Sequence, residues 1–287
     1  MSDTALSPIR QSRLPEGLRV FLRNRPAVIG LVVVIVLVLA TIFAADLTPY
    51  RPLRGVGRPL LPPGAKFPLG TDNLGRDVLT TILYGMRVSL IVGSIAATIA
   101  LVVGALMGAL AGYCGGAVDN AIMRVTELFQ VVPRIFLMIL AAALFGANIE
   151  VTSIAIGLTS WPPTARLLRA EFLSRRESEY VLAARVIGAS HTHIIFREIL
   201  PNAVAPVIVV AALNVATAVL LEASLAFLGL SDPNTASLGR MLEESIQYLR
   251  FAWWMSIFPG LVIVLIAVSM NMIGEGLAQI LDPKARR

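Results

Sequence analysis

The sequence predicts an all-α membrane protein with about six transmembrane helices, and its composition is the first reason. Hydrophobic residues make up 56% of the 287 residues and charged residues only 15%, whereas charged residues are about 25% of an average soluble domain. The mean hydropathy is +0.78. These values exclude a soluble enzyme and a disordered chain. A disulfide-stapled secreted domain is also excluded, because the single cysteine, Cys114, has no partner within the chain.

The second reason is a series of apolar segments, since one helical crossing needs about 20 apolar residues. Pro133 and Arg134 interrupt the third segment near its start, and Pro162 and Pro163 are expected to break the last turn of the shorter fourth. The first segment lacks a signal-peptide cleavage pattern and is expected to remain as an anchor. The six segments are residues 27–45, 88–112, 128–148, 151–165, 199–221 and 251–274.

Basic residues near the ends of the segments predict the orientation, because cytoplasmic loops carry an excess of Lys and Arg. One group precedes the first segment (Arg10, Arg13, Arg19, Arg23, Arg25), one lies between the fourth and fifth (Arg166, Arg169, Arg175, Arg176, Arg185, Arg197), and one ends the chain (Lys284, Arg286, Arg287). An even number of crossings puts all three on one side. We therefore expect a multi-pass protein of the plasma membrane with both termini cytoplasmic. The net charge of +6 is expected to face anionic lipid rather than nucleic acid.

The loop after the first segment disagrees with this orientation. Residues 47–85 would be external, yet they carry five basic residues: Arg51, Arg54, Arg58, Lys66 and Arg76. We let the three concordant groups decide, because the first span and its flanks usually dominate. The loop is rich in Pro and Gly, which predicts an ordered but irregular structure with extended pieces.

No segment predicts nucleotide, metal or nucleophile chemistry. Gly70 to Gly75 have the spacing of a phosphate loop, but Arg76 and Asp77 follow where that loop needs Lys and Ser or Thr. His191 and His193 diverge on a helix and have no companion ligands, so no metal site is expected. Cys114 lacks a nearby base. We expect no catalytic residue and no cofactor in this chain; if ATP powers it, another subunit binds the ATP.

Several residues inside the segments are candidates for packing or for a translocation path. Gly104, Gly108 and Gly112 recur every four residues and predict a smooth face on which another helix can pack. Glu222 lies within an apolar run, where an ionisable residue either lines a water-filled path or pairs with an Arg on another helix. Asn214 and Asn271 are expected to form hydrogen bonds between helices, and with Glu222 they are the candidates for the path.

The cytoplasmic segment 175–202 is the most informative. It predicts a helix from about Ser178, a break at Gly188 and a second short amphipathic helix that ends at Pro201. A protruding helix-turn-helix of this kind either fits a groove on a partner or folds back under the bundle, and the residues alone leave both open. Its apolar positions are Val181, Leu182, Val186, Ile187, Ile194, Ile195 and Ile199.

This segment resembles the coupling motif of binding-protein-dependent ABC importer permeases, inner membrane components that read Glu-Ala-Ala, three residues, Gly, nine residues, Ile-x-Leu-Pro. Leu182 and Glu198 depart from the motif, standing where the family often has Glu and Ile. The matching positions are Ala183, Ala184, Gly188, Leu200 and Pro201, and we expect these and the neighbouring Ala189 to be the ATPase-coupling residues.

Other segments resemble the dipeptide, oligopeptide and nickel branch of that family, in order along nearly the whole chain beyond residue 18. Within the branch the chain is most similar to the C-type dipeptide permease subunit. The family motif of the external loop includes Gly70, Thr71, Asp72, Gly75, Arg76 and Asp77. The matching stretches are residues 67–79 (FPLGTDNLGRDVL), 83–90 (LYGMRVSL), 225–230 (LAFLGL), 253–260 (WWMSIFPG) and 271–277 (NMIGEGL).

The resemblance implies a type I importer transmembrane domain and an ATP-driven importer of di- or oligopeptides. Its partners would be a second homologous permease, two ATPases that bind ATP and Mg²⁺, and an external solute-binding protein. The implied division is a cytoplasmic tail (1–26), an anchor helix (27–46), an external loop (47–86), a five-helix domain (87–279) with the coupling loop 175–202, and a second cytoplasmic tail (280–287).

Three alternatives to a peptide importer are considered. They are a nickel or other small-solute permease of the branch, an ion-coupled secondary transporter that uses Glu222, and a membrane scaffold without transport.

Overall fold

The computed structural model describes residues 16–281 and is helical. The basic tail residues Arg10, Arg13, Lys284, Arg286 and Arg287 lie outside that range. The described helices are α1 (Glu16–Arg23), α2 (Arg25–Ile42), α3 (Ala44–Leu47), α4 (Val78–Cys114), α5 (Gly116–Val131), α6 (Arg134–Phe145), α7 (Ile149–Ser160), α8 (Pro162–Arg176), α9 (Glu179–Val186), α10 (His191–His193), a π-helix (Ile194–Ile199), α11 (Leu200–Ala203), α12 (Ala205–Phe227), α13 (Leu238–Ser245), a 3₁₀ turn (Ile246–Tyr248) and α14 (Trp254–Leu281).

Four of these helices are long and apolar enough to cross a membrane: α2, α4, α12 and α14. A fifth crossing exists if α5 and α6, which meet at a bend of 85°, form one broken span. The described residues therefore hold four or five such spans where the sequence predicted six. The prediction of an all-α membrane protein is confirmed; the third and fourth predicted spans differ from their expected form.

The third predicted span, residues 128–148, is not one straight helix. α5 ends at Val131, and Val132 has extended backbone angles (φ −79°, ψ 125°) before Pro133. A proline restricts the residue before it to such angles and lacks the N–H that would continue the helix. From the sequence, Pro133 was expected only to interrupt a single span, whereas the chain bends by 85° there.

The fourth predicted span, residues 151–165, is divided at Trp161. The apolar helix α7 has 12 residues, about 18 Å at 1.5 Å per residue, well short of a hydrocarbon core of about 30 Å. α8 begins at Pro162, where a missing N–H is tolerated in a first helical turn. The break before Pro162 and Pro163 is where the sequence predicted it.

The other predicted spans also shift at their ends. α4 begins at Val78, ten residues before the predicted start at 88, because the side chain of Asp77 caps it by accepting from the Thr80 N–H at 2.8 Å. α12 begins at Ala205, with Pro206 in its first turn, and reaches Phe227. α14 continues to Leu281, past the predicted end at 274.

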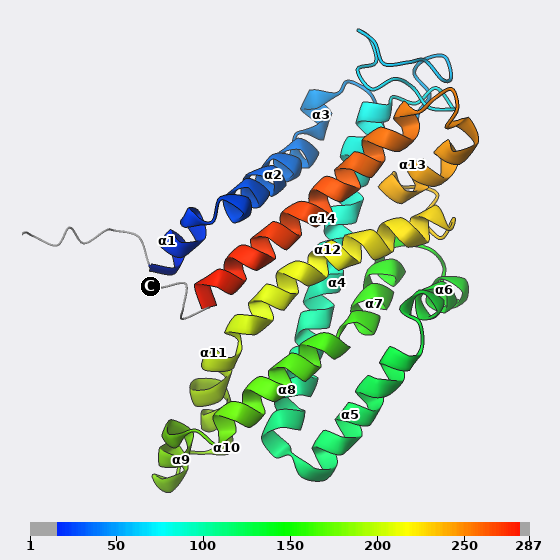
Figure 1. The fold of residues 1–287 in the computed structure, drawn as a ribbon. Helices are drawn as coiled ribbons and strands as arrows, with labels where there is room; N and C mark the ends of the chain where they lie inside the picture. Colours follow the sequence, from blue (N-terminus) through cyan, green and yellow to red (C-terminus); the bar gives the residue numbers. More distant parts are fainter. Residues whose placement is uncertain (1–15, 282–287) are drawn as a thin grey trace, which may run out of the picture.

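The long helix α4 is the centre of the bundle (Figure 1). α7 and α8 pack along one side of it and α12 along another; α14 packs against α12, and α2 lies against α14. Buried apolar side chains fill three clusters. One lies where α4, α13 and α14 meet the external loop, one lies among α4, α6, α7 and α12, and one lies under the segment from α8 to α11.

The glycine face of α4 receives α8. A Cβ placed on Gly104 would lie 2.6 Å from the Thr164 Cβ, and one on Gly108 would collide with the backbone oxygen of Ala165. A Cβ on Gly112 would lie 2.5 Å from the Phe172 Cβ. Residue numbers rise together along both helices, so the two run parallel, and the absent side chains allow their backbones to approach closely.

Gly108→Ala is expected to lower stability, although alanine is the better helix former by about 1 kcal/mol. The added methyl group meets backbone, which cannot move without separating α4 from α8, so we expect a loss of about 1–3 kcal/mol. Gly260→Ala in α14 is the matched control, because its nearest neighbour would be 3.9 Å away. Thermal unfolding in detergent should show a lower Tm for the first variant and an unchanged or higher Tm for the second; equal Tm values would contradict the packing argument.

Candidate functional site

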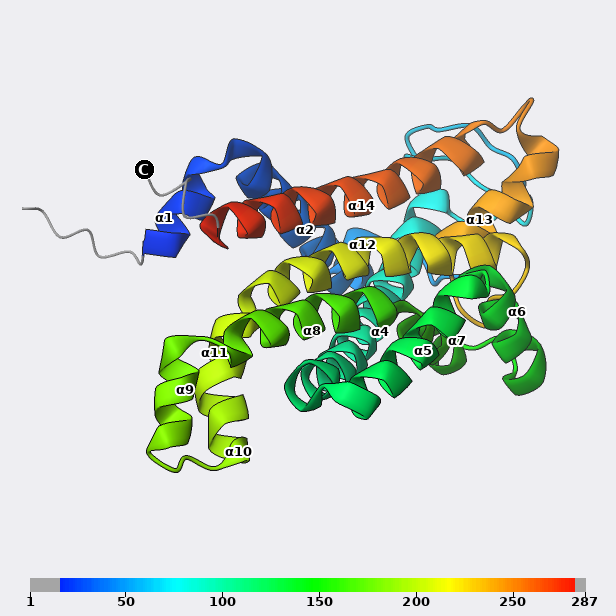
Figure 2. The ribbon, with the colours of Figure 1, turned by 60° about the horizontal axis from the view of Figure 1, so that its bottom comes forward.

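The segment predicted to couple to a partner forms a helical hairpin at one end of the molecule. α9 leads out from α8, the chain turns at Gly188, and α10, the π-helix and α11 lead back to α12. Figure 2 shows this hairpin extending beyond the bundle. The predicted helix start near Ser178 and the predicted break at Gly188 both match the structure, since α9 begins at Glu179 and Gly188 has φ +81°.

The apolar positions of the hairpin divide into two sets. Val181, Ile194 and Ile199 are 0–1% exposed and pack with Leu168 and Phe172 of α8. Val186 and Ile187, at the tip, are 87% and 84% exposed. One stripe therefore folds back onto the bundle, while the tip leaves apolar side chains exposed, and its contact with a partner stays a prediction.

The return arm corrects the prediction that its helix ends at Pro201. Residues Ile194–Ile199 form a π-helix, in which the Leu200 N–H donates to the carbonyl of Ile195 five residues earlier. Pro201 follows in the first turn of α11. Proline has no N–H to donate and its ring crowds the preceding turn, so a local π turn accommodates it without ending the helical path.

The remaining coupling residues have different surroundings. Ala183 and Pro201 are exposed, Ala184 is buried, and Ala189 and Leu200 are half-buried. Ala184 is thus part of the contact with the bundle. Ala183 and Pro201 are accessible on the hairpin surface.

The polar contacts that hold the hairpin and α8 to the rest of the bundle were not predicted from the sequence. Tyr113, at the end of α4, places its hydroxyl 2.6 Å from His191 Nδ1, and Arg176 donates to the Tyr113 carbonyl at 3.2 Å. Arg169 of α8 forms two hydrogen bonds with Asp119 of α5, the Nη2–Oδ2 distance being 2.6 Å. The polar residues at the helix ends near the hairpin were the available signal, and their partners depend on the three-dimensional packing.

The resemblance to importer permeases predicts that Gly188→Glu lowers stimulated ATP hydrolysis and uptake while the chain remains in the membrane. A Cβ at Gly188 would have no neighbour within 4 Å, so the reason is the left-handed backbone and not crowding. A non-glycine residue there costs about 1–2 kcal/mol, which reduces the population of the native turn relative to other conformations by about 5- to 30-fold. Substrate-stimulated ATPase activity of the assembled transporter measures the effect.

Gly146→Glu is the matched control, because Gly146 has φ +88° and likewise no neighbour within 4 Å. It follows α6, far from the hairpin (Figure 1). Equal losses in both variants would indicate a general folding defect. Undiminished uptake by Gly188→Glu would remove this turn from the mechanism.

Glu222 lies at a buried junction of three elements. The residue is 4% exposed. Its carboxylate accepts from Ser89 Oγ of α4 at 2.7 Å and from Ser237 Oγ before α13 at 3.0 Å. Among the described residues no Arg pairs with it, so the ion pair considered from the sequence is replaced by two serine hydroxyls.

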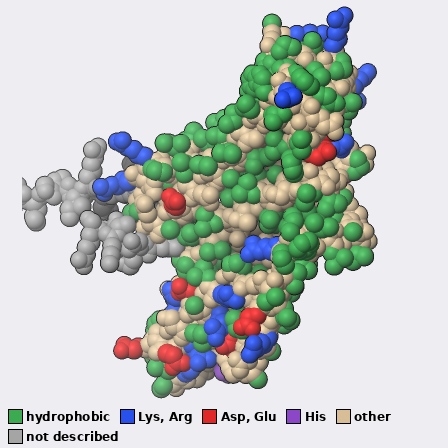
Figure 3. All heavy atoms as spheres, turned by 45° about the vertical axis from the view of Figure 1, so that its right-hand side comes forward, with side chains coloured by type: hydrophobic (Ala, Val, Ile, Leu, Met, Phe, Trp, Pro, Cys, Tyr) green, Lys and Arg blue, Asp and Glu red, His purple; other side chains and the backbone are tan. Residues whose placement is uncertain are grey.

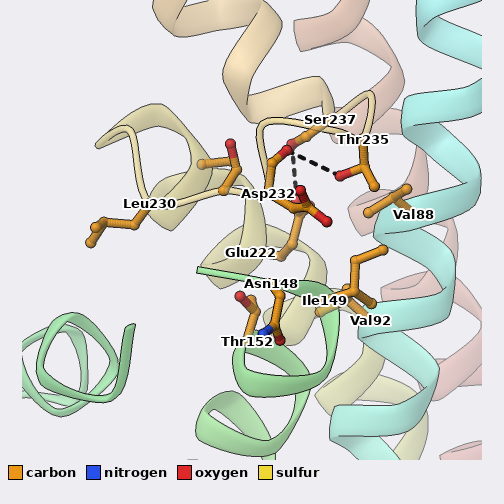
Figure 4. A pocket seen from close by; sticks show the side chains of 12 residues that line it. Val88, Val92, Asn148, Ile149, Thr152, Glu222, Leu230, Asp232, Thr235 and Ser237 are labelled. Carbon is orange, nitrogen blue, oxygen red and sulfur yellow. Dashed lines mark hydrogen bonds between the residues drawn. The ribbon is translucent and has the colours of Figure 1, made fainter. Parts of the chain in front are cut away.

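A small polar cavity adjoins this carboxylate (Figure 4). Its volume is about 20 Å³, room for about one water molecule. Asn148, Thr152, Asp232 and Thr235 supply further polar groups to its wall. The other two candidates for the path lie elsewhere: Asn214 donates to Thr164 Oγ1 at 3.4 Å, between α12 and α8, and Asn271 is exposed on α14.

The external family motif forms a buried turn that joins the loop to the bundle. Asp72, which is 4% exposed, accepts from the N–H groups of Leu74 and Arg76 at 2.8 Å and from the Arg76 guanidinium. Arg76 also pairs with Glu244 of α13. Burial acts to lower the pKa of Arg76, but Asp72 and Glu244 outweigh it and the pKa is raised, so the cation persists.

Thr71 and the motif glycines complete this turn. The Thr71 hydroxyl donates to the Arg58 carbonyl at 2.7 Å, and the Thr71 carbonyl accepts from Trp254 Nε1 at 3.1 Å. Gly70 (φ +79°) and Gly75 (φ +72°) have positive φ and lie against backbone. These residues therefore hold the loop together. Among residues 16–281, no three His, Cys, Asp or Glu side chains are grouped to hold a metal ion.

Comparison with known proteins identifies the family. Residues 100–287 match the family described as binding-protein-dependent transport system inner membrane component, and residues 12–63 match the N-terminal transmembrane domain of oligopeptide transport permease C. The chain is 40% identical to the dipeptide transport system permease protein DppC of Escherichia coli K12, over 98% of this chain and 96% of that protein. It is 34% identical to the Haemophilus influenzae protein of the same name, over 100% of both.

Solved structures show a related fold. The chain superposes on a chain of the MetNI methionine ABC transporter in an inward-facing conformation with a TM-score of 0.57 and 17% identity, over 70% of this chain and 96% of that chain. An amino acid ABC transporter gives a TM-score of 0.52 and 18% identity, over 71% and 94%. With the hairpin, the buried external motif and the apolar spans in place, the chain belongs to the family of binding-protein-dependent transport inner membrane components, as a multi-pass permease subunit with the type I ABC importer fold.

Proposed function

We propose that this chain forms half of the translocation path of an ATP-driven importer of short peptides. A second homologous permease forms the other half, two cytoplasmic ATPase subunits bind ATP and Mg²⁺, and an external solute-binding protein delivers the substrate. The observation that carries the proposal is the hairpin tip, where Val186 and Ile187 are 87% and 84% exposed on a segment whose inner stripe packs against the bundle. The relatives named as dipeptide permeases support the substrate class.

In this proposal the hairpin transmits ATPase closure to the spans. Its inner stripe, from Val181 to Ile199, is packed on α8, which in turn lies along the glycine face of α4. A force on the tip therefore reaches the central helix through tightly packed contacts. Residues 175–202 act as the coupling loop and residues 87–279 as the transporting domain, with 27–46 as an anchor helix and 47–86 outside. Glu222 lies at the external end of the path; Asn214 and Asn271 border it further along the spans.

Purification of the tagged chain from native membranes in mild detergent tests the proposal. Mass spectrometry of the stoichiometric partners should reveal a second permease and one or two ATPases. A co-purifying binding protein that binds dipeptides would support the substrate class, whereas one that binds nickel chelates would replace it. A lone chain that transports solute on an ion gradient would overturn the proposal in favour of a secondary transporter.

The proposed orientation predicts that Cys114 reacts from the cytoplasmic side only. Cys114 is exposed at the end of α4 and is the only cysteine in the chain. A membrane-impermeant maleimide should label it in inverted vesicles and leave it unlabelled in intact spheroplasts. Lys66→Cys combined with Cys114→Ser is the matched control and should give the opposite pattern, because Lys66 is exposed on the external loop. Labelling of Cys114 in intact spheroplasts would reverse the orientation.

A further inference from the structure

The external loop presents exposed charge of one sign. Its two acidic residues between 48 and 77, Asp72 and Asp77, are 4% and 3% exposed and are used inside the fold. Four basic side chains of the same stretch are exposed: Arg51, Arg54, Arg58 and Lys66. None of these four forms an ion pair with another residue of the described chain.

The fold gathers three of these basic residues, Arg51, Arg58 and Lys66, around Phe67. The Phe67 ring lies 5.7 Å from the Tyr50 ring and would touch a Cβ on Gly57 at 2.8 Å. Lys66 Nζ lies 5.3 Å from the same ring. Residues 50, 57 and 66 thus meet at one buried aromatic side chain, so their neighbours Arg51 and Arg58 lie close to Lys66.

Hydrogen bonds hold this arrangement in place. The Leu61 N–H donates to the Thr71 hydroxyl at 2.8 Å, and the Val56 N–H donates to the Gly75 carbonyl at 2.8 Å. The segment between is therefore fixed on the buried turn of Asp72 and Arg76. A positively charged surface on a fixed backbone is suited to a partner of defined shape, since little ordering is needed on binding.

This surface lies at the end of the molecule opposite the coupling hairpin. Figure 1 shows the loop beyond the first turn of α14, and Figure 3 shows Lys and Arg side chains at that end. Lys and Arg usually gather in cytoplasmic loops, so four exposed basic residues in an external loop are an exception to that bias. Their position beyond the span ends favours an aqueous partner over the lipid headgroups.

We propose that Arg51, Arg54, Arg58 and Lys66 dock an acidic face of the external solute-binding protein. This inference rests on the proposed importer function. Complementary charge across such a contact accelerates encounter and orients the partner, and its effect falls as salt rises. The contact of this chain with the binding protein should therefore be strongly salt-dependent.

The test uses the complete transporter in nanodiscs of phosphatidylcholine. The binding protein is titrated, and the concentration that gives half-maximal stimulation of ATPase activity is measured at 50 mM and 300 mM NaCl. Replacing all four residues with Gln should raise that concentration about tenfold or more at low salt and much less at high salt. Arg124→Gln, at a residue of α5 whose side chain is 82% exposed, should leave it unchanged.

Two results would overturn the docking surface alone. In the first, the wild-type transporter and the fourfold variant are stimulated at the same half-maximal concentration of binding protein. In the second, they differ only when phosphatidylglycerol is added to the nanodiscs, which would assign the surface to anionic lipid. If the wild-type complex is not stimulated by any binding protein, the proposed function fails and this inference fails with it. Gel filtration of the fourfold variant checks that the complex remains assembled.

Discussion

Replacing Val186 and Ile187 together with serine is expected to abolish stimulated ATP hydrolysis and uptake while leaving the fold intact. Both side chains are more than 80% exposed at the hairpin tip, so the isolated chain loses almost no buried contact. Burial of a Val or Ile side chain in a partner contributes about 1.5–3 kcal/mol. The double variant should therefore bind the ATPase at least about a hundredfold more weakly.

Co-purification of the ATPase and substrate-stimulated hydrolysis measure this effect. Leu74→Ser is the matched control for recovery of the ATPase, because Leu74 is 60% exposed at the opposite end of the molecule from the hairpin. The Tm of the purified double variant should equal that of the wild type. Normal ATPase recovery with the double variant would show that the hairpin tip is not the docking surface.

The sequence predicted well those features that depend on local chemistry. The turn at Gly188 follows from a glycine between two amphipathic stretches, and the close approach of α8 follows from Gly104, Gly108 and Gly112 on one face of α4. The membrane class follows from composition. The turn and the helix contact can be predicted from the spacing of neighbouring residues, and the membrane class from composition alone.

Long-range partners could not be predicted in the same way. Arg76 and Glu244 are 168 positions apart, and Glu222 meets Ser89 from 133 positions away. Which polar group meets which depends on helix register and on the 85° bend at Pro133, and a sequence pattern does not encode the angle of a bend. The failure at residues 128–148 has the same cause: hydropathy measures the length of an apolar run, not its path.

Arg76→Ala is expected to destabilise the external loop more than any other single exchange of a polar residue in the family motif. Arg76 is 6% exposed and lies between Asp72 and Glu244, and Arg240 Nε donates to Glu244 at 2.9 Å from the other side. Removing the guanidinium leaves the negative charges of the Asp72 and Glu244 carboxylates largely shielded from water and without their shared cation. Breaking a buried pair in this way costs about 3–5 kcal/mol.

Partial restoration distinguishes lost charge from lost packing. Arg76→Lys keeps the charge but loses the forked geometry that reaches both carboxylates, so its loss should be smaller than that of alanine. Arg76→Met with Glu244→Gln removes the cation and one anion while retaining volume, and should recover part of the Tm. The rate of limited proteolysis within residues 48–77 should rank the variants as the Tm does, with Arg76→Ala cleaved fastest. If Arg76→Ala cleaves no faster than the wild type, the charged turn does not hold the loop, and the docking surface built upon it would lose its rigid support.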